Sequence, residues 1–373
     1  MSPSVHAAAA GLRDVIRDAT DGLINREHLA ELLILAAVAQ EHLLVIGPPG
    51  TAKSAVVRRV AQSLGGRYFE YLLGRFTEPS ELFGPVNLVK LREGRVETDV
   101  AGMLPEADIA FLDEVFLGST AILNTLLGVL NERQFRRGHT QIACPLRVCV
   151  GAANALPDDE SLAAFADRFL LHVFVDAVPD AQLEALLEGG WQVGQRPVAV
   201  RAQLASLDVL HGAVASVDLA PVRADLAHAI RQLRHANILL SDRRIVKAQT
   251  LIAAAAVLAG RTAATRADLW PLVYVVPTAA GQQSARETLS TLLAEARHPL
   301  LQAVVEQAVQ QPLARVARLN EAADRLLGAA RGEGHQASVE ALLREIDANF
   351  TSTTLPPELA PRRAQLVTAA QAA

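Results

Sequence analysis

Eight consecutive residues near the start of the chain have the composition of a phosphate-binding loop. They are Gly47, Pro48, Pro49, Gly50, Thr51, Ala52, Lys53 and Ser54. The apolar run Leu43–Ile46 precedes them, and Ala55 opens a stretch with helical spacing. Between a strand and a helix, backbone N–H groups and the positive helix end bind phosphate. Lys53 would then reach the β- and γ-phosphates, and the Ser54 hydroxyl would be a Mg²⁺ ligand.

Position 52 departs from the usual pattern, which has glycine directly before the lysine. The methyl group of Ala52 restricts the backbone, so we expect the loop to keep its anion-binding shape with Ala52 at a negative φ. The alternative is a glycine-containing turn with no ligand. The further motifs described next favour a nucleotide site.

Three polar residues follow apolar, strand-like runs farther along the chain. Asp113 and Glu114 end the run Ile109–Leu112, about 60 residues after Lys53, and Asn154 follows a later run. Asp113 could anchor the metal shell, Glu114 could polarise the attacking water, and the neutral amide of Asn154 could orient it. The alternatives are helix-capping carboxylates and a turn asparagine.

Arg168 and Arg243 are candidates for stabilising the charge that develops on a transferred phosphoryl group. A surface salt bridge is the alternative for either arginine. Together the candidates supply each task of a nucleoside triphosphatase: phosphate binding, Mg²⁺ binding, water orientation and charge neutralisation.

The elements that must position these residues alternate between strand and helix. The predicted strands are Leu43–Ile46, Tyr68–Leu73, Ile109–Leu112, Leu146–Val150 and Phe169–Val175. This alternation predicts a parallel sheet wrapped by helices. Residues 7–40 are predicted to be helical, and residues 74–105 to be a helix interrupted by a β-hairpin. After Pro179 we expect almost only helix, with breaks at Gly189–Pro197 and Pro277–Gly281.

Composition excludes several classes of protein. The 373 residues allow two or three domains, and no apolar run approaches the ~18 residues of a membrane span. The net charge of −5 provides no general basic field for nucleic acid. Cys144 and Cys149 are interpreted as buried structural thiols. The N-terminal residues do not have the pattern of a secretory signal, so we expect a cytoplasmic protein.

These motifs resemble the P-loop ATPases of the AAA+ class and, more closely, the MoxR family and its RavA-like branch. The segments that carry the closer resemblance are Gly47–Ser54, Phe83–Pro85, Phe111–Phe116, Leu130–Arg136 and Ser241–Arg244. The resemblance covers about residues 5–280 and is loose over 281–373. It implies an α/β AAA+ core with a parallel five-stranded sheet over residues 1–190, an all-helical lid over 191–280 and a helical C-terminal extension over 281–373.

The resemblance also implies roles for single residues, with ATP and Mg²⁺ as cofactors. Gly47–Ala55 would be Walker A, Ser54 and Asp113 the metal-binding residues, Glu114 the Walker B glutamate and Asn154 sensor 1. Arg243 would be sensor 2, with Arg244 a less favoured neighbour. Arg168 would be an arginine finger that acts on the adjacent subunit's nucleotide, with Arg133 a weaker rival.

The resemblance also concerns two inserted hairpins and one domain that we expect this chain to lack. Val86–Val100 would be the helix-2 insert hairpin and Glu132–Cys144 the pre-sensor-1 hairpin, loops that line or cap the central opening of related rings. RavA-like proteins carry a large inserted domain in their C-terminal part. Arg331–His335 is predicted to be a bare turn, so we expect this chain to lack that domain.

The implied function is ATP hydrolysis by a hexameric ring that remodels a protein client, with a von Willebrand factor A domain protein as partner. One alternative is a DNA-directed AAA+ motor, favoured only by the basic cluster Arg133, Arg136, Arg137 and His139. A solvated hairpin tip is the favoured interpretation of that cluster. A second alternative is a nucleotide-sensing scaffold with negligible turnover.

Overall fold

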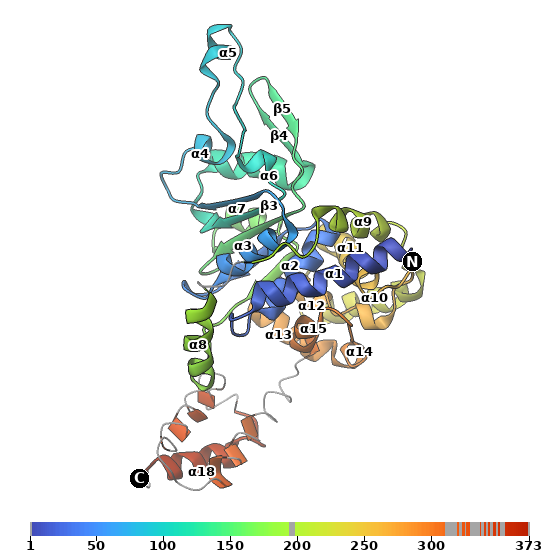
Figure 1. The fold of residues 1–373 in the computed structure, drawn as a ribbon. Helices are drawn as coiled ribbons and strands as arrows, with labels where there is room; N and C mark the ends of the chain where they lie inside the picture. The colour runs from blue at the N-terminus through green and yellow to red at the C-terminus, as the bar shows by residue number, and fades with distance from the viewer. Residues whose placement is uncertain are drawn as a thin grey trace. The chain divides into compact units, whose positions relative to one another are not determined.

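The computed structural model describes residues 2–193, residues 198–309 and separate stretches between residues 319 and 371. The chain forms two compact units. One contains Met1–Ala177 and Glu188–Val309, and the other contains Val178–Leu187 and Gln310–Ala373. Figure 1 shows the chain path through both units.

The first unit is built on a parallel five-stranded sheet, as predicted. The strands are β1 (Leu43–Ile46), β2 (Tyr68–Leu72), β3 (Ile109–Asp113), β6 (Val148–Ala153) and β7 (Leu171–Phe174). Their order is β2-β3-β6-β1-β7, and every neighbouring pair is parallel. Because all five strands run in the same direction, their carboxyl ends lie at one edge of the sheet.

Helices cover both faces of the sheet. The bounds of those that connect its strands are α3 (Lys53–Leu64), α6 (Thr120–Glu132) and α7 (Glu160–Ala166). Alternate residues of β1 enter different buried clusters. Leu43 and Val45 pack with α2 (Glu27–Ala39) and α3, whereas Leu44 and Ile46 pack with α6. The apolar runs of the sequence are thus strands buried on both faces, as is usual in parallel sheets.

The N-terminal helical region is two helices, not the continuous helix predicted over residues 7–40. They are α1 (Pro3–Thr20) and α2 (Glu27–Ala39). The turn between them contains Gly22 at φ +79°, a conformation in which side chains are strained. A Cβ at Gly22 would also lie 2.8 Å from Val193 Cγ2 and 3.0 Å from the Gly189 carbonyl oxygen. The break therefore follows from glycine conformation and close backbone packing.

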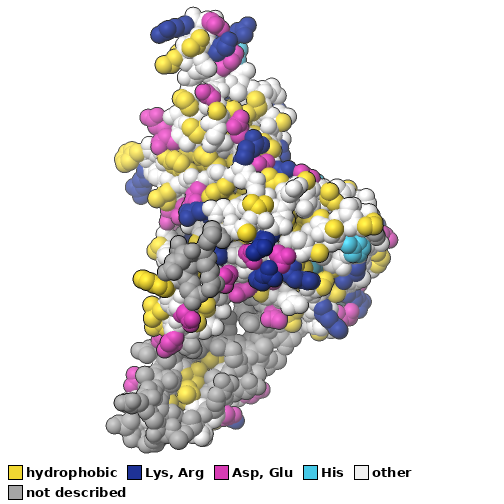
Figure 2. Space-filling model, viewed as in Figure 1, with side chains coloured by type: hydrophobic (Ala, Val, Ile, Leu, Met, Phe, Trp, Pro, Cys, Tyr) yellow, Lys and Arg dark blue, Asp and Glu magenta, His cyan; other side chains and the backbone are white. Residues whose placement is uncertain are grey.

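Two projections leave the sheet. The hairpin β4 (Gln134–Arg137) and β5 (Thr140–Ala143) confirms a hairpin within Glu132–Cys144. The β-hairpin predicted over Val86–Val100 is wrong in detail: Val86 and Thr98 form one isolated bridge, and the tip is α5 (Leu88–Arg92), capped by Asn87. A separate helix, α4 (Pro79–Phe83), precedes it. In Figure 2 apolar and basic side chains lie together at the end that carries α5.

The remaining helices of this unit extend the same core. They are α9 (Leu204–Val214), α10 (Ala220–His235), α11 (Asp242–Leu258), α12 (Leu272–Val275), α13 (Ala279–Thr288), α14 (Ser290–Leu293) and α15 (Gln302–Val309). Their buried residues join those of α1 and α2 in one cluster. The predicted lid, residues 191–280, therefore packs in the same compact unit as the sheet.

The break predicted over Gly189–Pro197 begins later than expected. Helix α8 (Leu183–Val193) contains Gly189 and Gly190, and residues 194–197 lie outside the described residues. Gly189 is needed because a Cβ there would lie 2.5 Å from the Gly22 carbonyl oxygen. Close packing against Gly22, and not chain flexibility, explains the glycine at position 189.

In the second unit, buried apolar side chains form a small cluster with α18 (Ala360–Gln371). Its members are Leu319, Ala323, Val339, Leu342, Ile346, Leu359 and Leu366. The predicted turn 331–335 lies outside the described residues. Across the parts of the chain that the structure describes, no helix combines the length and apolar character of a bilayer span.

Candidate functional site

The motif residues from three neighbouring strands lie together at the carboxyl edge of the sheet. Asp113 is the last residue of β3, Asn154 follows β6, and Gly47 follows β1. The strand order β3-β6-β1 makes these strand ends adjacent. The Gly47 N–H donates to the Ala153 carbonyl oxygen at 3.1 Å, which joins the start of the loop to the end of β6.

The loop Gly47–Ser54 has a backbone that requires two of its small residues. A Cβ at Gly47 would lie 2.1 Å from the Val175 carbonyl oxygen, so no other residue fits there without a backbone shift. Gly50 has φ +77° and faces open space. The loop leads directly into α3, so its N–H groups and the N-terminal end of a twelve-residue helix converge, as they do in anion sites.

The expectation that Ala52 keeps a negative φ is wrong. Ala52 has φ +61° and ψ +23°, the left-handed conformation, and it is the N-cap residue of α3. The loop thus takes the shape that glycine usually provides at this position, and the alanine accepts the strain. Alanine in place of glycine at position 52 therefore raises the conformational energy of the loop, while the backbone keeps the left-handed conformation.

Lys53 lies inside the loop. Its Nζ donates to the Gly47 carbonyl oxygen at 2.7 Å and to that of Pro48 at 3.0 Å, and the side chain is buried. Burial lowers the pKa of Lys53, and the nearby carboxylates of Asp113 and Glu114 oppose this decrease. The lysine and the acidic pair therefore share one electrostatic environment.

Glu114 and Asn154 are joined directly. Asn154 Nδ2 donates to Glu114 Oε1 at 2.7 Å, and Glu114 has φ +48°. Asp113 Oδ1 accepts from the Glu114 N–H at 3.1 Å. A strained backbone and a bonded side chain both restrict where the Glu114 carboxylate can lie. A carboxylate held by an amide is suited to orient a water, because the amide adds no charge to the pair.

The residues fit a magnesium triphosphate. Ser54, half-buried in the first turn of α3, and Asp113 offer the oxygen ligands that Mg²⁺ prefers. Within the described part of the chain, no cluster of three or more His, Cys, Asp or Glu could hold a metal ion. Mg²⁺ usually takes one or two protein oxygens and completes its shell with phosphate and water, which matches this arrangement.

The two candidate arginines lie at the opposite edge. Arg168 lies three residues before Leu171, the first residue of β7, which pairs with Leu43 at the amino end of β1. Arg243 Nη2 donates to Asn131 Oδ1 at 2.6 Å, near the end of α6, which runs back from the carboxyl edge. At roughly 3.3 Å per residue, β1 alone separates the two edges by about 13 Å. Neither arginine therefore lies beside the phosphate-binding loop of its own chain.

Arg133 is engaged inside the protein. Its Nη2 donates to the Gln40 carbonyl oxygen at 2.6 Å, and its Nη1 lies 2.9 Å from His42 Nε2. Arg136 forms an ion pair with Glu132 at 2.9 Å. The basic cluster that favoured a DNA-directed motor therefore does not present its arginines as one free patch.

Arg244 is a buried anchor for the segment that carries Arg168. The side chain is 2% exposed, and its Nε donates to Asp167 Oδ1 at 2.6 Å. Its Nη atoms donate to the carbonyl oxygens of Leu170 and Phe169, both at 2.9 Å. The guanidinium thus connects α11 to the turn between α7 and β7. The sequence named Arg244 only as a second choice for sensor 2, and nothing in it indicated this network.

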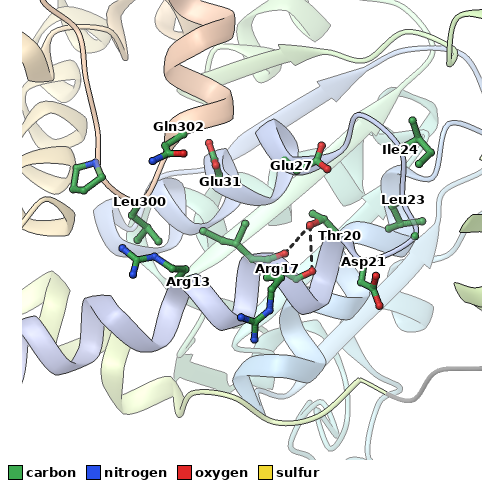
Figure 3. Close-up of a pocket in the computed structure, with 13 residues that line it drawn as sticks. Arg13, Arg17, Thr20, Asp21, Leu23, Ile24, Glu27, Glu31, Leu300 and Gln302 are labelled. Atoms are coloured by element: carbon green, nitrogen blue, oxygen red, sulfur yellow. Dashed lines mark hydrogen bonds between the residues drawn. The ribbon is translucent and has the colours of Figure 1, made fainter. Parts of the chain in front are cut away.

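A separate pocket of about 500 Å³ lies between α1, α2 and the start of α15 (Figure 3). Arg13 and Arg17 come from α1, and Glu27 and Glu31 from α2. Glu31 accepts hydrogen bonds from the backbone N–H groups of Ala303 at 3.3 Å and Val304 at 2.8 Å. Burial raises the pKa of Glu31 to about 7. None of the predicted site residues lines this pocket.

Comparisons with known proteins identify the family of the chain. Residues 10–212 match the family model described as the MoxR domain in MoxR–vWA–beta-propeller ternary systems, and residues 219–287 match an AAA lid domain. Two uncharacterized proteins of Methanocaldococcus jannaschii are each 33% identical, over 66% and 68% of this chain and 66% of their own length. The chaperone MoxR1 of Mycobacterium tuberculosis is 24% identical over 50% of this chain and 49% of its own length.

One solved structure shows the same fold. The crystal structure of a proposed ATPase from Cytophaga hutchinsonii superposes with a TM-score of 0.63 and 16% sequence identity. The match covers 79% of this chain and 97% of that protein. At this identity the likeness concerns the fold alone, namely a parallel sheet with helices.

Proposed function

The chain belongs to the MoxR family of AAA+ ATPases, and from this premise we propose that it hydrolyses ATP in a ring and thereby remodels a protein client. The observation that supports hydrolysis best is the cluster at the carboxyl edge. Lys53 and Ser54 would hold the phosphates and Mg²⁺ with Asp113, and Glu114, held by Asn154, would orient the attacking water. Bound Mg²⁺ would neutralise charge on the phosphates.

We propose a ring because neither Arg168 nor Arg243, the candidates for stabilising the developing charge, lies beside the cluster of its own chain. Arg168 and Arg243 lie at the far edge of the sheet, where a neighbouring protomer's phosphate loop could meet them. A head-to-tail contact of this kind generates a closed ring, and the family resemblance suggests six subunits. Arg168 is the favoured finger over Arg133, because Arg133 is occupied by Gln40 and His42.

The proposed partner is a protein with a von Willebrand factor A domain. Its support is the description of the matched family model, which names MoxR, vWA and beta-propeller components together. The chaperone description of the mycobacterial relative supports a remodelling role. Assignment to the RavA-like branch stays a prediction.

The first experiment measures the ATPase rate per chain as a function of protein concentration. We expect the rate to rise with concentration as protomers assemble. Glu114→Gln should bind ATP and hydrolyse it at least 100-fold more slowly, on the order of other losses of a catalytic polar group. Glu132→Gln, an exposed carboxylate on α6, is the matched control and should have the wild-type rate. Normal turnover in Glu114→Gln would remove Glu114 as the water-orienting group.

A mixing experiment tests the action between subunits. Arg168→Ala should lose about 10³-fold or more in rate, as arginine fingers do, whereas Arg234→Ala, an exposed control, should not. Lys53→Ala should lose nucleotide binding. In a one-to-one mixture of Arg168→Ala and Lys53→Ala, random head-to-tail neighbours restore about a quarter of the sites. No recovery at any ratio would argue that Arg168 does not act on an adjacent subunit.

A further inference from the structure

Arg26 is a buried cation that contacts the phosphate loop, and no sequence motif indicated it. The side chain is 4% exposed and stands at the N-cap position of α2. Its Nε donates to the Thr51 carbonyl oxygen at 2.7 Å and its Nη2 to the Asp176 carbonyl oxygen at 2.9 Å. Its Nη1 donates to the Asn25 carbonyl oxygen at 2.8 Å. One guanidinium thus joins three chain segments.

The bond to Thr51 controls the direction of the next N–H group. The peptide unit is planar and trans, so the N–H of Ala52 points away from the Thr51 carbonyl. With that carbonyl held towards Arg26, the Ala52 N–H is directed to the other side of the peptide plane. Ala52 also has the strained φ of +61°. A strained conformation persists only where its surroundings hold it, and the Arg26 bond supplies such a hold.

The charge of Arg26 has no carboxylate bonded to it among the ion pairs of the described residues. The guanidinium donates instead to the backbone carbonyl oxygens of Thr51, Asn25 and Asp176. Burial lowers the pKa of Arg26, and the charges of Asp176 and Glu27 oppose this decrease. The charge of Arg26 contributes in turn to the lowered pKa of Lys53. Two cations around one loop are costly in the protein interior, and a polyphosphate would offset that cost.

We propose that Arg26 is a positioning residue for nucleotide binding, which holds the Thr51 carbonyl so that the loop keeps its phosphate-binding shape. This inference depends on the proposed function. It also connects the loop to Asp176, which lies two residues before Val178, where the chain enters the second compact unit. The state of the phosphate site therefore has a direct hydrogen-bonded link to the exit from β7.

The test compares nucleotide binding in Arg26→Lys and Arg26→Gln with binding in the wild type. Lysine keeps the charge, but its single ammonium cannot reproduce the three-carbonyl geometry of the guanidinium. Glutamine keeps a donor and loses the charge. Arg58→Lys is the matched control, since Arg58 is an exposed arginine on α3 paired with Glu70. Fluorescent MgADP and MgATP are the probes, and thermal unfolding is recorded for each sample.

We expect both Arg26 variants to bind MgADP and MgATP at least tenfold more weakly, with KM raised in proportion and kcat of the saturated enzyme changed less than threefold. Guanidinium added to Arg26→Gln should recover part of the affinity. Arg58→Lys should match the wild type. A role in stability alone would lower the unfolding temperature and leave the dissociation constants of the folded protein unchanged, and that result would overturn the inference.

The wild-type control separates the two proposals. If the wild type binds neither nucleotide, the proposed function fails. If the wild type binds both and either folded Arg26 variant binds equally well, only the role of Arg26 fails. Hydrogen exchange provides a second readout: MgADP should slow exchange at residues 175–177 in the wild type and not in Arg26→Lys. Equal slowing in the two proteins would refute the link to Asp176.

Discussion

Replacing Ala52 by glycine should stabilise the protein, although alanine-to-glycine changes usually destabilise. Ala52 has φ +61° and ψ +23°, and the left-handed region costs a residue with a Cβ about 1–2 kcal/mol. Glycine removes that cost but adds about 0.4–1 kcal/mol of entropy to the unfolded chain. The net expectation is a gain of about 0.5–1 kcal/mol in the free energy of unfolding.

A matched control is available in α10. Ala224 is exposed in the interior of that helix, where glycine costs about 0.5–1 kcal/mol relative to alanine. Ala224→Gly should therefore lose stability while Ala52→Gly gains it, a difference of about 1–2 kcal/mol between two identical chemical changes. The two variants make the same chemical change at a left-handed residue and at a helical residue.

The assay is denaturant unfolding followed by tryptophan fluorescence. The chain has two tryptophans. Trp270 is fully buried in the first unit, whereas Trp191 is 78% exposed. A Trp191→Phe background leaves Trp270 as the reporter of the unit that contains the loop. Equal losses in Ala52→Gly and Ala224→Gly would refute the left-handed conformation of Ala52.

Two further predictions concern the loop and the pocket. Gly47→Ala should destabilise the protein by more than about 2 kcal/mol and weaken MgADP binding at least tenfold, because the new Cβ would lie 2.1 Å from the Val175 carbonyl oxygen. Gly190→Ala is the control, since Gly190 has open space around it. Equal effects of the two changes would contradict the argument. Burial raises the pKa of Glu31 to about 7 from 4.5, so the folded chain keeps a proton that the unfolded chain loses as pH rises, and this contribution to stability is lost between about pH 4.5 and 7. The unfolding free energy of wild type relative to Glu31→Gln should therefore fall by up to about 3 kcal/mol from pH 5 to pH 8; denaturant titrations at both pH values measure it, and a constant difference would contradict the assignment.

The parts of the fold that followed from the sequence are those with one dominant signal. The apolar runs Leu43–Ile46 and Ile109–Leu112 are buried strands because each is apolar at successive positions and bounded by polar residues. Lys53 and Glu114 were found because their motif has a fixed order along the chain. Asn154 bonds to Glu114 because β3 and β6, the strands that these residues follow, are neighbours in the sheet.

Other features depend on contacts between distant segments and had no local signal. Gly189 was predicted in a linker, yet it lies in α8 because the backbone at Gly22 approaches it. Arg26 contacts Thr51 across 25 positions of sequence, and Asp176 across 150. The negative φ expected for Ala52 reflected the steric preference of a single alanine. The contacts that hold the loop, such as the bond from Arg26 to the Thr51 carbonyl oxygen, cannot be read from the local sequence.

The placement of the two arginines bears on how hydrolysis would be controlled. Arg244 bonds to Asp167 and to the backbone of Phe169, so the turn that carries Arg168 is tied to helix α11 of the predicted lid. Arg243, the next residue, contacts Asn131 at the same edge. A lid movement would therefore shift both arginines together. In the proposed ring, that movement would act on the neighbouring protomer's phosphates and leave the loop of its own chain unchanged. Nucleotide state would then pass between subunits in one direction around the ring, because each chain presents its loop at one edge of the sheet and its arginines at the other.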